Sequence, residues 1–304
     1  MEVKICPMCQ KENAANAVLC EHCFAAIRSV QPISKEPAKV ASAPAGQQKV
    51  IDVSKMGFAC NNFVFSRQDV EDITNEIFTT STYLNEYRTL VDKITLTYDE
   101  FNMDINAYAG WSDAVNEIGP YIKMCEGMIA KTIPIAAMYL RGVRGTDLIY
   151  WIKAFSKDPD IFDGQIPAEA RELGKAMLAE VIAHETAHIV KKHLPTLVRY
   201  SHSSKEQLYE LVRNFERDAD MTAIMILETT PYRAFYFLGA LLISLVIYIN
   251  EYSMFDYDGS HSHPADKERL LNLLVHSTKM LLQAGINSDE LNAYCNLAGV
   301  SLIG

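Results

Sequence analysis

The stretch from residue 167 to residue 195 constrains the fold more than any other part of the chain, because its apolar side chains recur at the spacing of a long α-helix. These positions are Leu173, Met177, Val181, Ile182 and Ile189. Three polar residues, His184, Glu185 and His188, lie within the same apolar run. A buried helix carries such groups only when they have polar or ionic partners, since unpaired burial is costly. The sequence therefore predicts a buried helix whose polar groups face a partner.

His184, Glu185 and His188 form the pattern HExxH. Histidines four residues apart project from one helical face about one turn apart, so both imidazoles can bind a single Zn²⁺ ion. Glu185 lies on the neighbouring flank, where it can take a proton from a zinc-bound water and deliver it to a leaving amine. The alternative is a polar stripe on an exposed helix, which the apolar flanking residues oppose. We therefore predict a catalytic zinc site with Glu185 as the general base.

A catalytic zinc with two histidine ligands needs a third protein ligand, and residues 216–220 (ERDAD) offer one. Glu216 and Asp220 are four residues apart and share a helical face. We predict that Glu216 is the third ligand and that Asp220 accepts the remaining N–H of a ligand histidine, which fixes the tautomer of that ring. The alternative is an acidic helix in solvent, paired with Arg213 and Arg217. That alternative would be preferred if HExxH did not precede it.

Together these motifs resemble those of the gluzincin metallopeptidases of the HtpX and CAAX prenyl protease type, in which HExxH is followed by ExxxD on a later helix. Two further pairs of motifs match this family in order. Upstream, Asn106-Ala107-Tyr108-Ala109 precedes a Gly-Pro strand that begins at Gly119, and downstream Ser262-His263-Pro264 precedes Arg269. The motifs together cover roughly residues 60–275. The resemblance implies a zincin-like fold and a zinc endopeptidase that hydrolyses bonds in peptide or protein substrates.

The same resemblance implies roles for the outlying motifs. His263 would donate a hydrogen bond to the tetrahedral oxyanion, the alternative being a polar helix cap before Pro264. Arg269 would be a structural partner of the acidic residues near the zinc. The Asn106–Ala109 strand would bind substrate by edge pairing. Membrane-embedded members of the family place several spans around these motifs, so a soluble subgroup is the better comparison. The phage-exclusion peptidases that cleave a translation factor are a weaker resemblance.

The N-terminal segment carries a second metal-type motif. Its four cysteines are Cys6, Cys9, Cys20 and Cys23. They form two CxxC knuckles, a ligand set typical of tetrahedral structural zinc, and the metal is expected to supply most of the folding energy of such a short segment. We predict a zinc ribbon over residues 1–28, which either docks a protein partner or is only a folded tag. Residues 29–55 have the composition of a flexible linker, and residues 56–304 form the predicted metallopeptidase domain.

Periodicity and turn residues predict an α+β fold that is mostly α, with a small mixed sheet in the middle of the chain. The expected strands are residues 93–98, 105–109 and 121–124. The expected helices are residues 66–91, 125–140 with a kink or break at Pro134, 167 to a stop at Pro195, 203–228 after a capping box of Ser203 and Glu206, 234–250, and a helix opened by Pro264.

Composition and charge exclude several other classes. The 304 residues are 49% hydrophobic and carry a net charge of -10, which argues against general nucleic-acid binding. Seven cysteines without a disulfide pattern, and no secretory signal, favour a cytoplasmic location. The uncharged run at residues 234–250 is shorter than the roughly 20 apolar residues of a membrane span. We predict a buried core helix there; the alternative is the anchor of a membrane-associated protease.

A rival function is a non-catalytic adaptor, stabilised by zinc, that docks partners through the ribbon. The complete set of His184, Glu185, His188 and Glu216 argues against it, because a scaffold does not need a general base. Of the remaining histidines, we predict that His193 and His202 lie on the surface. The remaining cysteines, predicted to be buried core thiols, are Cys60, Cys125 and Cys295.

Overall fold

The structure is a computed structural model. It describes residues 2–5, 12–14, 31, 33–34, 64–143, 147–148, 150–152, 154, 166–233, 239 and 292. Several predicted features lie outside these residues. They are the four cysteines Cys6, Cys9, Cys20 and Cys23, the predicted linker at 29–55 except residues 31, 33 and 34, the segment 234–250 except Gly239, and the downstream residues His263 and Arg269.

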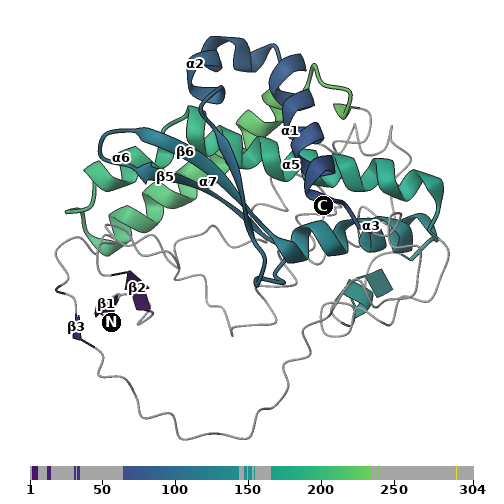
Figure 1. Ribbon diagram of the computed structural model, residues 1–304, viewed down its shortest axis with the longest axis horizontal. Helices are drawn as coiled ribbons and strands as arrows, with labels where there is room; N and C mark the ends of the chain where they lie inside the picture. The colour runs from purple at the N-terminus through teal and green to yellow at the C-terminus, as the bar shows by residue number, and fades with distance from the viewer. Residues whose placement is uncertain are drawn as a thin grey trace, which may run out of the picture.

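The described part of the chain is mostly helical, with small sheets, which confirms the predicted α+β class (Figure 1). The helices are α1 (Arg67–Thr80), α2 (Arg88–Val91), α3 (Glu126–Leu140), α5 (Ala168–Val190), α6 (His193–Arg199) and α7 (Lys205–Leu227), and the 3-10 helix η3 (Tyr83–Tyr87) precedes α2. The central strands are β4 (Thr95–Asp99), β5 (Ala107–Asp113) and β6 (Ile118–Cys125). A separate N-terminal sheet consists of β1 (Glu2–Ile5), β2 (Glu12–Ala14) and β3 (Ile33–Ser34), in the order β2-β1-β3.

Helix α5 is the centre of the core. It contacts α1, α3, α7 and the strands β5 and β6, so nearly every side of the helix is covered. Its buried residues include Leu173, Met177 and Ile182, which the helical spacing had singled out, and also Gly174 and Ala183 between them. A helix that is covered on most of its sides buries some polar residues as well as apolar ones, and here His184 is buried and His188 is half-buried.

The central sheet lies against one side of α5 and has the order β4-β6-β5, with β4 parallel to β6 and β5 antiparallel to it. All three predicted strands are present, but β5 and β6 extend further than predicted and form a hairpin through a turn at residues 114–117. The extension passes through Gly110, where the ring of Tyr121 on the paired strand occupies the space of a β-carbon. Cross-strand packing of this kind leaves no alternating apolar pattern in the sequence.

Two helix boundaries differ from the predictions because distant residues decide them. The predicted helix at 66–91 ends at Thr80, and the next turn is held by a hydrogen bond from the Thr82 N–H to Thr229 Oγ1 at 2.9 Å. Helix α5 ends before Pro195, because Lys192 adopts a left-handed conformation with φ of 56°. Pro195 lies instead in the first turn of α6, where its missing N–H is not needed.

Two further details of the predicted helices are corrected. Of the two alternatives at Pro134, a kink or a break, the break is wrong, because helix α3 continues through this residue. The capping box of α7 uses Ser204 and Gln207, one position after the predicted pair, with the Ser204 N–H donating to Gln207 Oε1 at 3.0 Å. Among the helices that the structure describes, none has the length and apolarity that a membrane span requires.

Candidate metal centre

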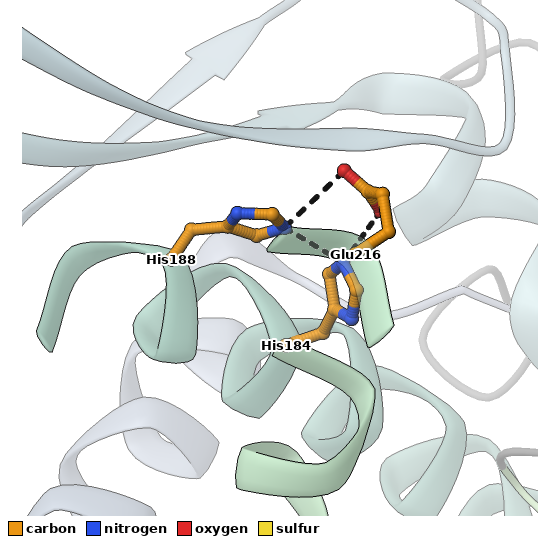
Figure 2. A group of neighbouring side chains, drawn as sticks. All are labelled: His184, His188 and Glu216. Carbon is orange, nitrogen blue, oxygen red and sulfur yellow. Dashed lines mark hydrogen bonds and ion pairs between the residues drawn. The ribbon is translucent and has the colours of Figure 1, made fainter. Parts of the chain in front are cut away.

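The predicted zinc ligands converge between α5 and α7 (Figure 2). His184 and His188 point from successive turns of α5 toward Glu216, which α7 presents from the opposite side. The two Nε2 atoms lie 3.0 Å apart. Glu216 places Oε2 at 3.4 Å from His184 Nε2 and Oε1 at 3.5 Å from His188 Nε2. His184 and Glu216 are buried and His188 is half-buried.

This donor set fits a zinc ion. Zinc–nitrogen and zinc–oxygen bonds of about 2.0–2.2 Å in a tetrahedral site place neighbouring ligand atoms roughly 3.3–3.5 Å apart. The separations of 3.0, 3.4 and 3.5 Å among the three side chains lie close to that range. Two histidines and one glutamate are a ligand set of catalytic zinc, which keeps its fourth position open for water or substrate. The residues present can therefore hold the ion that the motifs predicted.

Asp220 supports the first histidine. Its Oδ1 lies 2.8 Å from His184 Nδ1, one helical turn beyond Glu216 on α7. A carboxylate accepts only, so the ring carries its proton on Nδ1 and presents a lone pair at Nε2, on the side of Glu216. Glu180, one turn before His184 on α5, brings a second carboxylate to the same side of that ring. The contact predicted for Asp220 is thus present, and Glu180 is an addition that HExxH and ExxxD do not reveal.

Glu185 of α5 contacts the central sheet. Its Oε2 accepts a hydrogen bond of 2.5 Å from the backbone N–H of Ala109 on β5. The register explains why this N–H is available. The Cys125 N–H donates to the Asn106 carbonyl, so in an antiparallel ladder the backbone groups of residues 108 and 110 face β6, and those of 107, 109 and 111 face away from it. The general-base candidate is therefore held by the outer edge of β5.

The predicted substrate strand is an edge strand in the part of the chain that the structure describes, since β5 pairs there with β6 alone. Its polar side chains are engaged locally. Asn106 Oδ1 accepts from the Ala107 N–H at 2.8 Å, and its Nδ2 donates to the Tyr108 hydroxyl at 3.2 Å. Burial raises the pKa of Tyr108 to about 12, so the phenol stays neutral at physiological pH. Asn106 and Tyr108 thus shape the start of the strand, while its outer backbone groups face away from β6.

His193 does not lie on the surface, contrary to the prediction. It is 5% exposed, and its Nδ1 lies 2.9 Å from His188 Nδ1 while its Nε2 lies 3.1 Å from Asp218 Oδ2. Its ring stacks on Phe215 with centroids 4.3 Å apart and planes 6° from parallel. Burial lowers the pKa of His193 and outweighs the neighbouring carboxylate, so the neutral ring is favoured. The left-handed residue Lys192 turns α6 back toward α7, and helical periodicity gives no sign of this turn.

The other side-chain predictions have mixed outcomes. His202 is exposed and Cys125 is fully buried, as predicted, and burial raises the pKa of the Cys125 thiol to about 12. His263, Arg269 and the four N-terminal cysteines lie outside the described residues, so the roles predicted for them remain predictions. Comparison of the chain with known protein families, with curated proteins and with solved structures gives no significant match.

Proposed function

We propose that this protein is a zinc-dependent endopeptidase with a zincin-like domain, related to the gluzincins of the HtpX and CAAX prenyl protease type. One observation carries the proposal: His184 Nε2, His188 Nε2 and the Glu216 carboxylate meet at separations of 3.0–3.5 Å inside the protein. Glu185 and the edge of β5 lie beside this cluster. A structural zinc site would instead be closed by a fourth protein ligand and would not need Glu185.

A zinc ion bound by His184, His188 and Glu216 would polarise a scissile carbonyl and lower the pKa of a bound water to near 7. With zinc bound, Glu185 would be the general base for that water and would pass the proton to the leaving amine. The N–H of Ala109 holds one oxygen of Glu185 in place. The outward-facing backbone groups of β5 other than the Ala109 N–H bind the peptide in extended form, so the main chain is recognised more than any particular side chain.

The proposal extends to the parts of the chain beyond this site. Cys6, Cys9, Cys20 and Cys23 bind a second, structural zinc in an N-terminal ribbon that docks a protein partner. The strands β1 and β2, which flank the segment that contains Cys6 and Cys9, pair with each other in antiparallel fashion. His263 donates to the oxyanion and Arg269 supports the acidic residues. We place the protein in the cytoplasm, with peptides or proteins as substrates.

The test compares the full-length wild type with the substitution Glu185→Gln on an unstructured peptide. The variant should keep its zinc and lose about three orders of magnitude or more in kcat/KM, since it lacks the general base. Glu172→Gln makes the same chemical change on the same helix, at an exposed residue paired with Lys175, and should cleave as the wild type does. Cleavage by Glu185→Gln at the wild-type rate would refute the mechanism.

Zinc content separates the peptidase from the adaptor. The peptidase requires two zinc ions per chain, one of which is lost in the variant His188→Ala. A single zinc that this substitution leaves in place would favour a zinc-stabilised adaptor.

A further inference from the structure

We propose that His193 and Asp218 form a relay that fixes the tautomer and orientation of His188, and that both are positioning residues of the zinc site. This inference rests on the proposed function, because it assumes that His188 is a zinc ligand. Neither residue belongs to the HExxH or ExxxD pattern. The inference rests on the position of His193 between Asp218 and His188. His193 Nε2 lies 3.1 Å from Asp218 Oδ2, and His193 Nδ1 lies 2.9 Å from His188 Nδ1.

The direction of the hydrogen bonds follows from the acceptor at the end of the chain. Asp218 presents carboxylate oxygens, so the proton between it and the ring lies on His193 Nε2. A neutral imidazole with its proton on Nε2 has a lone pair at Nδ1. That lone pair faces His188 Nδ1 at 2.9 Å, so His188 must carry its own proton on Nδ1. The lone pair of His188 is then at Nε2, the atom that faces His184 and Glu216.

The two histidine ligands thus have the same tautomer but different supports. His184 donates directly to Asp220, whereas His188 reaches its carboxylate through a second histidine. The helical geometry of α7 accounts for the difference. Asp220 follows Glu216 by one turn and shares its face, whereas Asp218 is about 200° around the helix from Glu216 and faces another flank. A bridging ring is needed to connect that flank to His188.

The surroundings hold the bridging ring in one orientation. His193 is almost fully buried and stacks on Phe215, which lies three residues before Asp218 on the same flank of α7. The preceding residue, Lys192, has a positive φ, which is uncommon for a residue other than glycine. Lys192 also forms an ion pair with Glu117 in the turn between β5 and β6. Lys191 contacts the other oxygen of Asp218 at 3.6 Å, so the carboxylate itself has two partners.

The experiment measures the zinc affinity of the full-length protein by competition with a chromophoric chelator. His188→Ala identifies the zinc that belongs to this site and separates it from zinc bound elsewhere in the chain. His193→Phe keeps the ring that stacks on Phe215 but removes both nitrogens. It should weaken zinc binding about 10- to 100-fold, the usual effect of removing a group that orients a metal ligand. His202→Gln, at an exposed histidine, should leave the affinity unchanged.

A conservative variant distinguishes positioning from packing. The side-chain oxygen of asparagine occupies nearly the place of a histidine Nδ1, so His193→Asn keeps an acceptor for His188 and should retain zinc affinity within a few-fold of wild type. His193→Gln reaches Asp218 but places no acceptor at that point, and it should bind zinc as weakly as His193→Phe. The zinc affinity of Asp218→Asn should lie between that of His193→Asn and that of His193→Phe. The melting temperatures of the zinc-free proteins show whether each variant is folded.

Each outcome decides the question. Wild-type affinity in His193→Phe, or equal weakening by His193→Asn and His193→Gln, would overturn the relay and leave the proposed peptidase standing. If His193→Phe does not fold, the comparison of the asparagine and glutamine variants replaces it. If the wild type has no zinc that His188→Ala removes, the proposed function fails and the relay fails with it.

Discussion

The hydrogen bond between Ala109 and Glu185 predicts the effect of the substitution Ala109→Pro. Proline removes the backbone N–H, and this N–H faces away from β6, so the ladder between β5 and β6 keeps its bonds. Edge strands tolerate proline when its nitrogen faces outward. The residue before it must be extended, and Tyr108 already lies in a strand. The substitution should therefore leave the sheet intact and release Glu185.

The magnitude follows from the bond that is lost. A hydrogen bond to a charged group contributes about 1.5–3 kcal/mol. If that free energy serves to hold Glu185 against the reacting water, its loss lowers kcat/KM by about 10- to 150-fold at 1.36 kcal/mol per tenfold. Folding loses the same bond but gains about 0.4–1 kcal/mol from the stiffer unfolded chain. The free energy of unfolding should fall by about 0.5–2.6 kcal/mol.

The assay pairs peptide cleavage with urea unfolding of full-length Ala109→Pro. The variant Ala109→Gly is the comparison at the same position, because it removes the methyl group and keeps the N–H. It should stay far closer to the wild type in kcat/KM than the proline variant does. Unchanged kcat/KM in a folded Ala109→Pro protein would show that the N–H does not position Glu185. Loss of the sheet in that variant would show that the N–H of Ala109 faces β6 and that the assigned register is wrong.

Two further predictions concern stability. In Gly127→Ala the new β-carbon would lie 2.0 Å from the Met103 carbonyl oxygen, so the loop before β5 must shift; thermal unfolding should show a loss of about 1–3 kcal/mol, and an unchanged melting temperature would refute the contact. Burial tends to raise the pKa of Asp69, but hydrogen bonds from Ser66 and Arg171 lower it overall, so this carboxylate stabilises the fold above its unfolded pKa of about 3.9. Asp69→Asn should therefore be less stable than wild type at pH 7, and the difference should vanish as the pH falls through the lowered pKa; a difference that persists at still lower pH would contradict this.

The parts of the fold that could be predicted from sequence are those encoded by local patterns. Helices α5 and α7 and the three central strands follow from periodicity and caps. Their precise ends do not, because they depend on distant partners: Thr229 holds the turn after α1, and Glu117 pairs with Lys192 at the end of α5. The predicted hairpin strands are shorter than the observed ones, because Gly110 packs under Tyr121. No alternation of apolar residues signals this contact.

In the candidate site, too, local sequence patterns predict some side chains and not others. His184, His188 and Glu216 could be predicted because fixed helical spacing determines which groups share a face. His193 could not, since its position depends on a left-handed residue between two helices rather than on spacing within one.

The position of that turn matters for the chemistry as well as for the fold. Two imidazole nitrogens and two carboxylate oxygens face one another at 3.0–3.5 Å, and the supports at Asp220 and His193 turn both nitrogens into lone-pair acceptors. A buried cluster made only of acceptors is unfavourable unless a cation occupies its centre. In the proposed zinc site, the hydrogen bonds behind the histidines would therefore favour a metal, because they would remove the protons that could otherwise link His184, His188 and Glu216 to one another.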